Sequence, residues 1–135
     1  MAVWSGHDLA DRSSVSLEDF ADRVFIDPGP RVPEYWAQSM LPQHTPSGRR
    51  VPRGPLIGTF HMVLSRIAAR ECLAPLNEHV PHYYSTPGVA FVPVHDAPIT
   101  EWVLVWRKDV LHPRGRGFVD VVTELGPREF GTVRQ

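Results

Sequence analysis

Residues 56–76 read LIGTFHMVLSRIAARECLAPL and carry the strongest structural signal in the chain. Apolar residues at the spacing of one helix face predict a helix over residues 60–68; they are Phe60, Val63, Leu64, Ile67 and Ala68. Thr59 stands at the N-cap position of this helix, where a hydroxyl can bind a free backbone N–H. The apolar runs 56–58 and 72–76 on either side predict buried strands, so the stretch predicts a strand–helix–strand unit.

The segments before this unit continue the same alternation. Ser16 and Asp19 are spaced as in a capping box and predict a short helix ending near Asp22. A strand is predicted over residues 24–26, and a helix over residues 33–41 with a proline at its first position. Residues 42–55 hold four prolines and no periodicity, which predicts a long exposed loop.

The segments after the unit complete the pattern. A short helix is predicted between Asn77 and Tyr84, and because Pro81 would break a helix that began at Asn77, we expect either a later start or a 3₁₀ turn. A strand is predicted over residues 89–94, where Pro93 favours a sheet edge or a crossing segment, and another over residues 102–106, buried on both faces. A last helical stripe is formed by Phe118, Val121, Val122 and Leu125 and closed by Gly126. Together these segments predict an α/β fold with helices on the faces of a sheet.

Composition limits the classes of function. The chain has 135 residues and a net charge of -1, so the basic excess typical of proteins that bind nucleic acid by charge is missing. Cys72 is the only cysteine, which excludes an internal disulfide and favours a reducing compartment. No signal peptide and no apolar run of membrane-spanning length occurs, and we expect a cytoplasmic protein without a membrane partner.

Two loop–helix junctions are the candidate ligand site, because ligands of open α/β sheets bind where strands lead into helices. The first junction carries Pro33, Tyr35 and Trp36, and the second carries Gly58, Thr59 and Phe60. Free N–H groups at such helix starts favour a carboxylate or a similar anion. In the alternative interpretation, Thr59 is only a helix cap and the aromatic residues belong to the core.

Other candidate sites carry weaker signals. His79 and His82 are three residues apart but have no third convergent ligand, so we expect no metal site. Cys72 lies in an apolar segment, where a thiol is usually inert, and a cluster of arginines (Arg49, Arg50 and Arg53) is more typical of a solvated loop than of an anion site. No motif of a nucleotide-binding loop or a hydrolase nucleophile is present, and we expect neither an enzyme nor a cofactor.

The order of several stretches resembles the LysR-type transcriptional regulators. Near the start, His7-Asp8-Leu9-Ala10 and the segment Ser16–Asp22 resemble the H-P-L-A and S-L-x-D-L-A-D stretches of that family. The resemblance continues through segments 64–69, 73–76 and 83–98, and through Trp102–Arg107 into the helix of Phe118. Asp8 replaces the usual proline, and Arg70 and Cys72 replace glycines.

The resemblance implies a fold similar to type 2 periplasmic binding proteins, in which two α/β lobes hold an effector. Residues 1–22 would then be the outgoing segment of lobe I, residues 23–91 most of lobe II, and residues 92–135 the returning segment of lobe I. The winged helix-turn-helix and the first part of lobe I would be lacking, so no direct DNA contact is expected.

The implied function is the sensing of a small organic acid or aromatic metabolite, with both loop–helix junctions contacting it. The implied partners are a second copy of the chain or intact regulator subunits. An interaction protein or remnant that binds no ligand and dimerises with intact regulators is the alternative.

Overall fold

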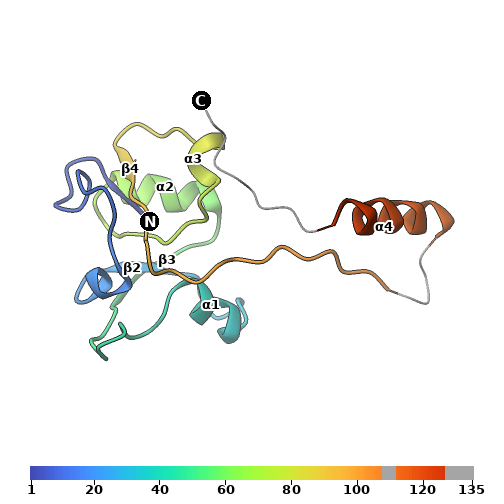
Figure 1. Ribbon diagram of the computed structural model, residues 1–135. Helices are drawn as coiled ribbons and strands as arrows, with labels where there is room; N and C mark the ends of the chain where they lie inside the picture. Colours follow the sequence, from blue (N-terminus) through green and yellow to red (C-terminus); the bar gives the residue numbers. More distant parts are fainter. Residues whose placement is uncertain (108–111, 127–135) are drawn as a thin grey trace. The chain divides into compact units, whose positions relative to one another are not determined.

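The computed structural model describes residues 1–107 and 112–126, and the chain divides into two compact units, Met1–Ile99 and Thr100–Gln135 (Figure 1). Within these described residues, the first unit holds four short strands and most of the helices, and the second holds one helix. The elements in chain order are β1 (Ala2–Trp4), the 3₁₀ helix η1 (Leu17–Phe20), β2 (Phe25–Asp27), α1 (Glu34–Met40), β3 (Arg53–Leu56), α2 (Phe60–Ala68), α3 (Val80–Tyr83), β4 (Val89–Phe91) and α4 (Pro113–Leu125).

The strands form two small sheets that one extended segment links. β2 pairs with β3 in parallel, and β1 pairs with β4 in antiparallel orientation. Leu73 and Ala74 lie between the sheets: Leu73 bridges to Phe25 of β2, and Ala74 bridges to Ala2 of β1. The hydrogen bonds of this segment, Ile26 N to Leu73 O at 2.9 Å and Ala2 N to Ala74 O at 2.7 Å, make the order β3–β2–segment–β1–β4 one continuous layer.

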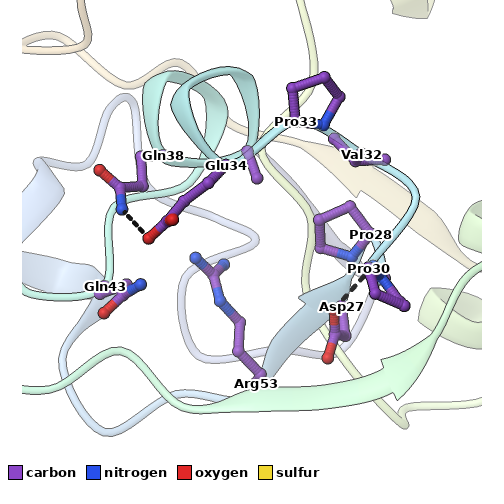
Figure 2. A pocket seen from close by; sticks show the side chains of 11 residues that line it. Asp27, Pro28, Pro30, Val32, Pro33, Glu34, Gln38, Gln43 and Arg53 are labelled. Carbon is purple, nitrogen blue, oxygen red and sulfur yellow. Dashed lines mark hydrogen bonds between the residues drawn. The ribbon is translucent and has the colours of Figure 1, made fainter.

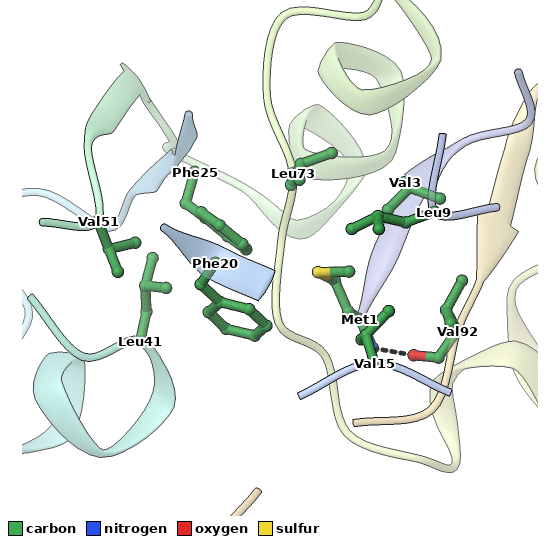
Figure 3. Close-up of a cluster of buried hydrophobic side chains, with 10 residues drawn as sticks. All are labelled: Met1, Val3, Leu9, Val15, Phe20, Phe25, Leu41, Val51, Leu73 and Val92. Atoms are coloured by element: carbon green, nitrogen blue, oxygen red, sulfur yellow. Dashed lines mark hydrogen bonds between the residues drawn. The ribbon is translucent and has the colours of Figure 1, made fainter. Parts of the chain in front are cut away.

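Alternating side chains of this layer build a core on each face. One cluster, drawn in Figure 3, contains Met1, Val3, Leu9, Val15, Phe20, Phe25, Leu41, Val51, Leu73 and Val92. The other cluster joins α2 to the layer; it contains Val63 and Ile67 of α2 together with Ala2, Cys72 and Ala74. Neighbouring residues therefore divide between the clusters, Val3 from Ala2 and Leu73 from Cys72, as the period of two in extended backbone requires.

Three helix predictions are confirmed. α2 spans residues 60–68, buries Val63, Leu64 and Ile67, and is capped by the Thr59 side chain. α3 starts late, at Val80, with Pro81 in its first turn. α4 ends at Gly126, whose φ of 67° is the left-handed conformation that favours glycine.

Several strand predictions are wrong in position or extent. β3 covers Arg53–Leu56 and not residues 56–58, so the predicted loop contains a strand. Pro52 and Pro55 do not prevent this, because β3 pairs along one edge only, through bonds such as Phe25 N to Pro52 O at 3.0 Å. The predicted strand 72–76 is reduced to the two bridges of Leu73 and Ala74, and β4 ends at Phe91.

The apolar run 102–106 in the second unit is not a strand. Trp102 is 65 % exposed, Val103 74 % and Val105 82 %. A strand covered on both faces needs a neighbouring strand on each side, and none of the strand pairings among residues 1–107 and 112–126 includes this run. None of the helices in the described part of the chain has the length and apolar character that a membrane span needs.

Candidate functional site

An open groove of about 430 Å³ lies along α1 in the first unit (Figure 2). It extends from the carboxyl end of β2, through the turn between β2 and α1, to Arg53 at the start of β3. Its volume falls within the range of small-molecule sites. The lining residues are Asp27, Pro28, Gly29, Pro30, Val32, Pro33, Glu34, Ala37, Gln38, Gln43 and Arg53.

Arg53 supplies the positive charge of the groove. Its Nη2 donates a hydrogen bond to the carbonyl of Leu41, just beyond the end of α1, at 2.5 Å. Its Nη1 is buried and has no hydrogen-bond partner among the described residues. Burial lowers the pKa of Arg53, and the nearby Asp27 carboxylate opposes that shift. An unsatisfied buried donor costs about 1–3 kcal/mol, so a turn of the guanidinium that brought Nη1 to an acceptor in the groove would gain a hydrogen bond.

Two carboxylates face the same groove. Asp27 accepts a hydrogen bond from the backbone N–H of Gly29 at 2.8 Å through one oxygen, which fixes the turn that leads to α1. Glu34 accepts one from the Gln38 side chain at 2.8 Å, again through one oxygen (Figure 2). The groove therefore places one guanidinium and two carboxylates around a partly apolar wall.

The structure brings one predicted residue of the first junction to this groove. Pro33 lines it. Tyr35 and Trp36 are 78 % and 48 % exposed and are not among the lining residues. α1 has only seven residues, and Pro33 at its start has no N–H, so this junction provides less of an anion site than its sequence suggests.

The second junction lies outside the groove lining. Thr59 is the N-cap of α2, and its side chain accepts a hydrogen bond from Met62 N at 3.4 Å. Phe60 packs against Tyr84, with ring centroids 4.7 Å apart. Gly58 has space around it, because an added Cβ would meet only the Met62 sulfur at 3.7 Å. The structure therefore shows Thr59 as the N-cap of α2, as the alternative interpretation expects.

Sequence reasoning missed the charged residues of the groove. Arg53 was grouped with Arg49 and Arg50 as a solvated loop, yet it lies in a strand and is partly buried. One sequence signal was available. Arg53 lies only three residues before the apolar run 56–57, which is compatible with a strand that begins at residue 53 and not at residue 56. Asp27 carried a signal too, since it directly follows a buried strand.

Other reactive side chains form no further site. No group of three or more metal-ligating side chains occurs in the described ranges 1–107 and 112–126. His79 lies near Tyr83, with ring centroids 6.3 Å apart. Cys72 is 1 % exposed, and its burial raises the pKa of the thiol to about 11.

Comparison with known proteins identifies the family to which the chain belongs. No curated protein and no solved structure matches the chain. The model of the LysR substrate binding domain matches residues 1–127, nearly the whole chain. This family has the α/β fold of type 2 periplasmic binding proteins, in agreement with the small sheets and covering helices described above. The chain therefore belongs to the LysR substrate-binding domain family, whose members are the effector-binding, regulatory modules of transcription regulators.

Proposed function

We propose that this chain senses a small carboxylate, which binds in the groove along α1 with its negative charge on Arg53. The buried, unpartnered Nη1 of Arg53 is the observation that carries the proposal. A carboxylate would accept this donor in a charge-assisted bond, which is stronger than a bond between neutral groups. The apolar wall, which includes Val32 and Ala37, would contact the rest of the molecule.

The six residues of the two junctions are part of the proposal as secondary contacts. Pro33 would form a wall of the site, and Tyr35 and Trp36, exposed on α1, would be available to an aromatic ring. Gly58, Thr59 and Phe60 would contact the effector from the start of α2, a helix of nine residues with free N–H groups at its first turn. Binding would change the relation between lobes, and the regulatory signal would pass to DNA-bound subunits without DNA contact by this chain.

A thermal-shift panel of small aliphatic and aromatic carboxylates tests this function. A binding carboxylate at about 100 times its Kd should stabilise the folded protein by about 2.7 kcal/mol. Arg53→Met should weaken that carboxylate about tenfold or more, because the charge partner is lost. Arg50→Met is the matched control, since Arg50 is an exposed arginine of the same segment and should bind the carboxylate like the wild type.

Two results would reject or narrow the proposal. If no carboxylate stabilises the protein, or if Arg53→Met binds as well as Arg50→Met, the function is not carried by this groove. Thr59→Ala in the same panel decides on the second junction: unchanged affinity leaves Thr59 as a cap alone.

The exposed run 102–106 favours a second candidate function, association with a second copy or with intact regulator subunits. Five consecutive apolar residues stand exposed there, two of them tryptophans. Apolar patches of this kind mark interaction surfaces in many proteins. We propose a cytoplasmic, non-enzymatic role for either function, as the sequence predicts.

A further inference from the structure

We infer that the effector of this groove is a zwitterion: a molecule with an ammonium group close to its carboxylate, such as an α-amino acid with an apolar side chain. The inference rests on the proposed function and narrows the class of ligand. It follows from the two carboxylates that share the groove with Arg53.

The charges of the groove do not neutralise one another by contact. The ion pairs found within the described residues do not include one between Arg53 and either Asp27 or Glu34. Each carboxylate uses one oxygen, Asp27 toward Gly29 and Glu34 toward Gln38, and no hydrogen bond within the described ranges uses the other oxygen. Three charged side chains, two negative and one positive, therefore line one open groove without direct ion pairs between them.

Electrostatics in such a space discriminates between ligand classes. A simple carboxylate would gain the bond to Arg53 but would stand near two negative charges, which repel it. A simple amine would bind the carboxylates and leave Nη1 of Arg53 unpaired. A zwitterion places each of its charges against the opposite sign, so it alone satisfies all three groups.

The apolar wall of the groove favours a ligand whose uncharged part is apolar. Apolar side chains make up much of the lining, namely Pro28, Pro30, Val32, Pro33 and Ala37. An apolar side chain on the zwitterion would cover this wall and gain free energy from the area removed from water.

Calorimetry on the full chain with three matched probes tests the inference. The probes are phenylalanine, 3-phenylpropanoate and 2-phenylethylamine, which share the ring and differ in charge; leucine, 4-methylpentanoate and 3-methylbutylamine form a second set. Within at least one set, the amino acid should bind about tenfold or more tightly than its carboxylate and its amine.

Variants of the two carboxylates should change the affinities for the amino acid and for its matched carboxylate differently. A purely structural role of these residues would not produce that difference. Asp27→Asn and Glu34→Gln keep the acceptor atoms that bind Gly29 and Gln38, so both should fold. Each should weaken the amino acid about tenfold while leaving the matched carboxylate unchanged or tighter, because one repulsive charge is gone. Glu78→Gln, at an exposed position outside the groove, should change neither affinity.

The outcomes separate this inference from the proposed function. If the carboxylate binds as tightly as the amino acid and depends on Arg53, the carboxylate function stands and the zwitterion is rejected. If Asp27→Asn and Glu34→Gln leave amino-acid affinity unchanged, the zwitterion is again rejected. If no probe of either set binds, the zwitterion inference is overturned, and the thermal-shift panel with Arg53→Met decides separately on the proposed function.

Discussion

Arg23 and Arg53 are two half-buried arginines of the first unit, and they differ in how many of their hydrogen-bond donors have a partner. Arg23 binds the Asp8 carboxylate with both terminal nitrogens, at 2.9 and 2.8 Å, and the Asp19 carbonyl with Nε at 2.9 Å. Arg53 has one bond and one unpaired buried nitrogen. The contacts of Arg23 are therefore those of a structural residue, whereas Arg53 has a donor free to bind a ligand.

The thiol of Cys72 should be unreactive in the folded protein. Burial raises its pKa to about 11, so at about pH 8 roughly one thiol in a thousand is ionised. Iodoacetamide treatment followed by mass spectrometry should find Cys72 unmodified in buffer and alkylated in denaturant. Rapid alkylation of the native protein would contradict the described burial and reopen a role for the thiol in catalysis.

Asp19 should make the free energy of unfolding depend on pH in the acid range. Hydrogen bonds from the backbone and side chain of Ser16 hold the pKa of Asp19 below its ordinary value of 3.8, and Arg12 and Arg23 act in the same direction. A carboxyl with a lower pKa in the folded state stabilises the fold above its unfolded pKa, and this contribution is lost as the pH falls through the folded pKa.

Urea unfolding of Asp19→Asn measures this contribution. The variant should be less stable than the wild type at about pH 7, and the difference should disappear as the pH falls through the lowered pKa that Asp19 has in the folded state. Asp11→Asn, at an exposed aspartate nearby, should match the wild type at both pH values. A difference between Asp19→Asn and the wild type that does not vary with pH would show that charge is not its cause.

At the scale of elements, the parallel pair β2–β3 requires a glycine at position 54. An added Cβ at Gly54 would lie 2.4 Å from Cγ1 of Val24 and 3.2 Å from the carbonyl oxygen of Phe25. The second contact is with the backbone of β2, which cannot move away without weakening the pairing. This close approach of backbones also positions Arg53, the residue before Gly54, along the groove.

Gly54→Ala should therefore destabilise the fold by about 1–3 kcal/mol, the usual range for overpacking. Gly58→Ala is the matched control, because its added Cβ would make only an ordinary contact of 3.7 Å with Met62; its stability should stay within about 0.5 kcal/mol of the wild type. Equal unfolding midpoints in urea for the two variants would contradict the close packing of β2 and β3.

Helices were predictable from the sequence because their signals are local. The stripe of α2, its cap at Thr59 and the glycine after α4 all lie within a few residues of the elements that they define. Strands depend on partners far along the chain. β1 has only three residues and no turn signal of its own, and the proline-rich segment that becomes β3 does so because β2 lies beside it.

The candidate site was predictable only in outline, for the same reason. The turn after β2 and Pro33 follow from the local sequence, but the approach of Arg53 to α1 depends on the pairing of β2 with β3. The run 102–106 shows the opposite error, since apolar content alone predicted a buried strand for which no partner is described.

On the scale of the whole molecule, the exposed run 102–106 should promote self-association. Substituting its two most exposed residues, Val103→Glu and Val105→Glu, should weaken any dimer about tenfold or more, because charges would be buried in the interface. Sedimentation velocity over a range of concentrations measures this effect. His82→Glu adds the same charge at an exposed position of α3 and should not alter association. A wild-type protein that stays monomeric at all concentrations would argue against the second candidate function.

The pairing of β1 with β4 also governs how the first unit forms during synthesis. Ala2 pairs with Phe91, so the earliest residues of the unit cannot gain their strand partner until almost all of it has left the ribosome. At a translation rate of about 5–20 residues per second, this interval lasts about 4 to 18 seconds. Until then the cluster that holds Val3 and Leu9 lacks Val92, and apolar residues exposed in this way make a nascent chain prone to aggregation.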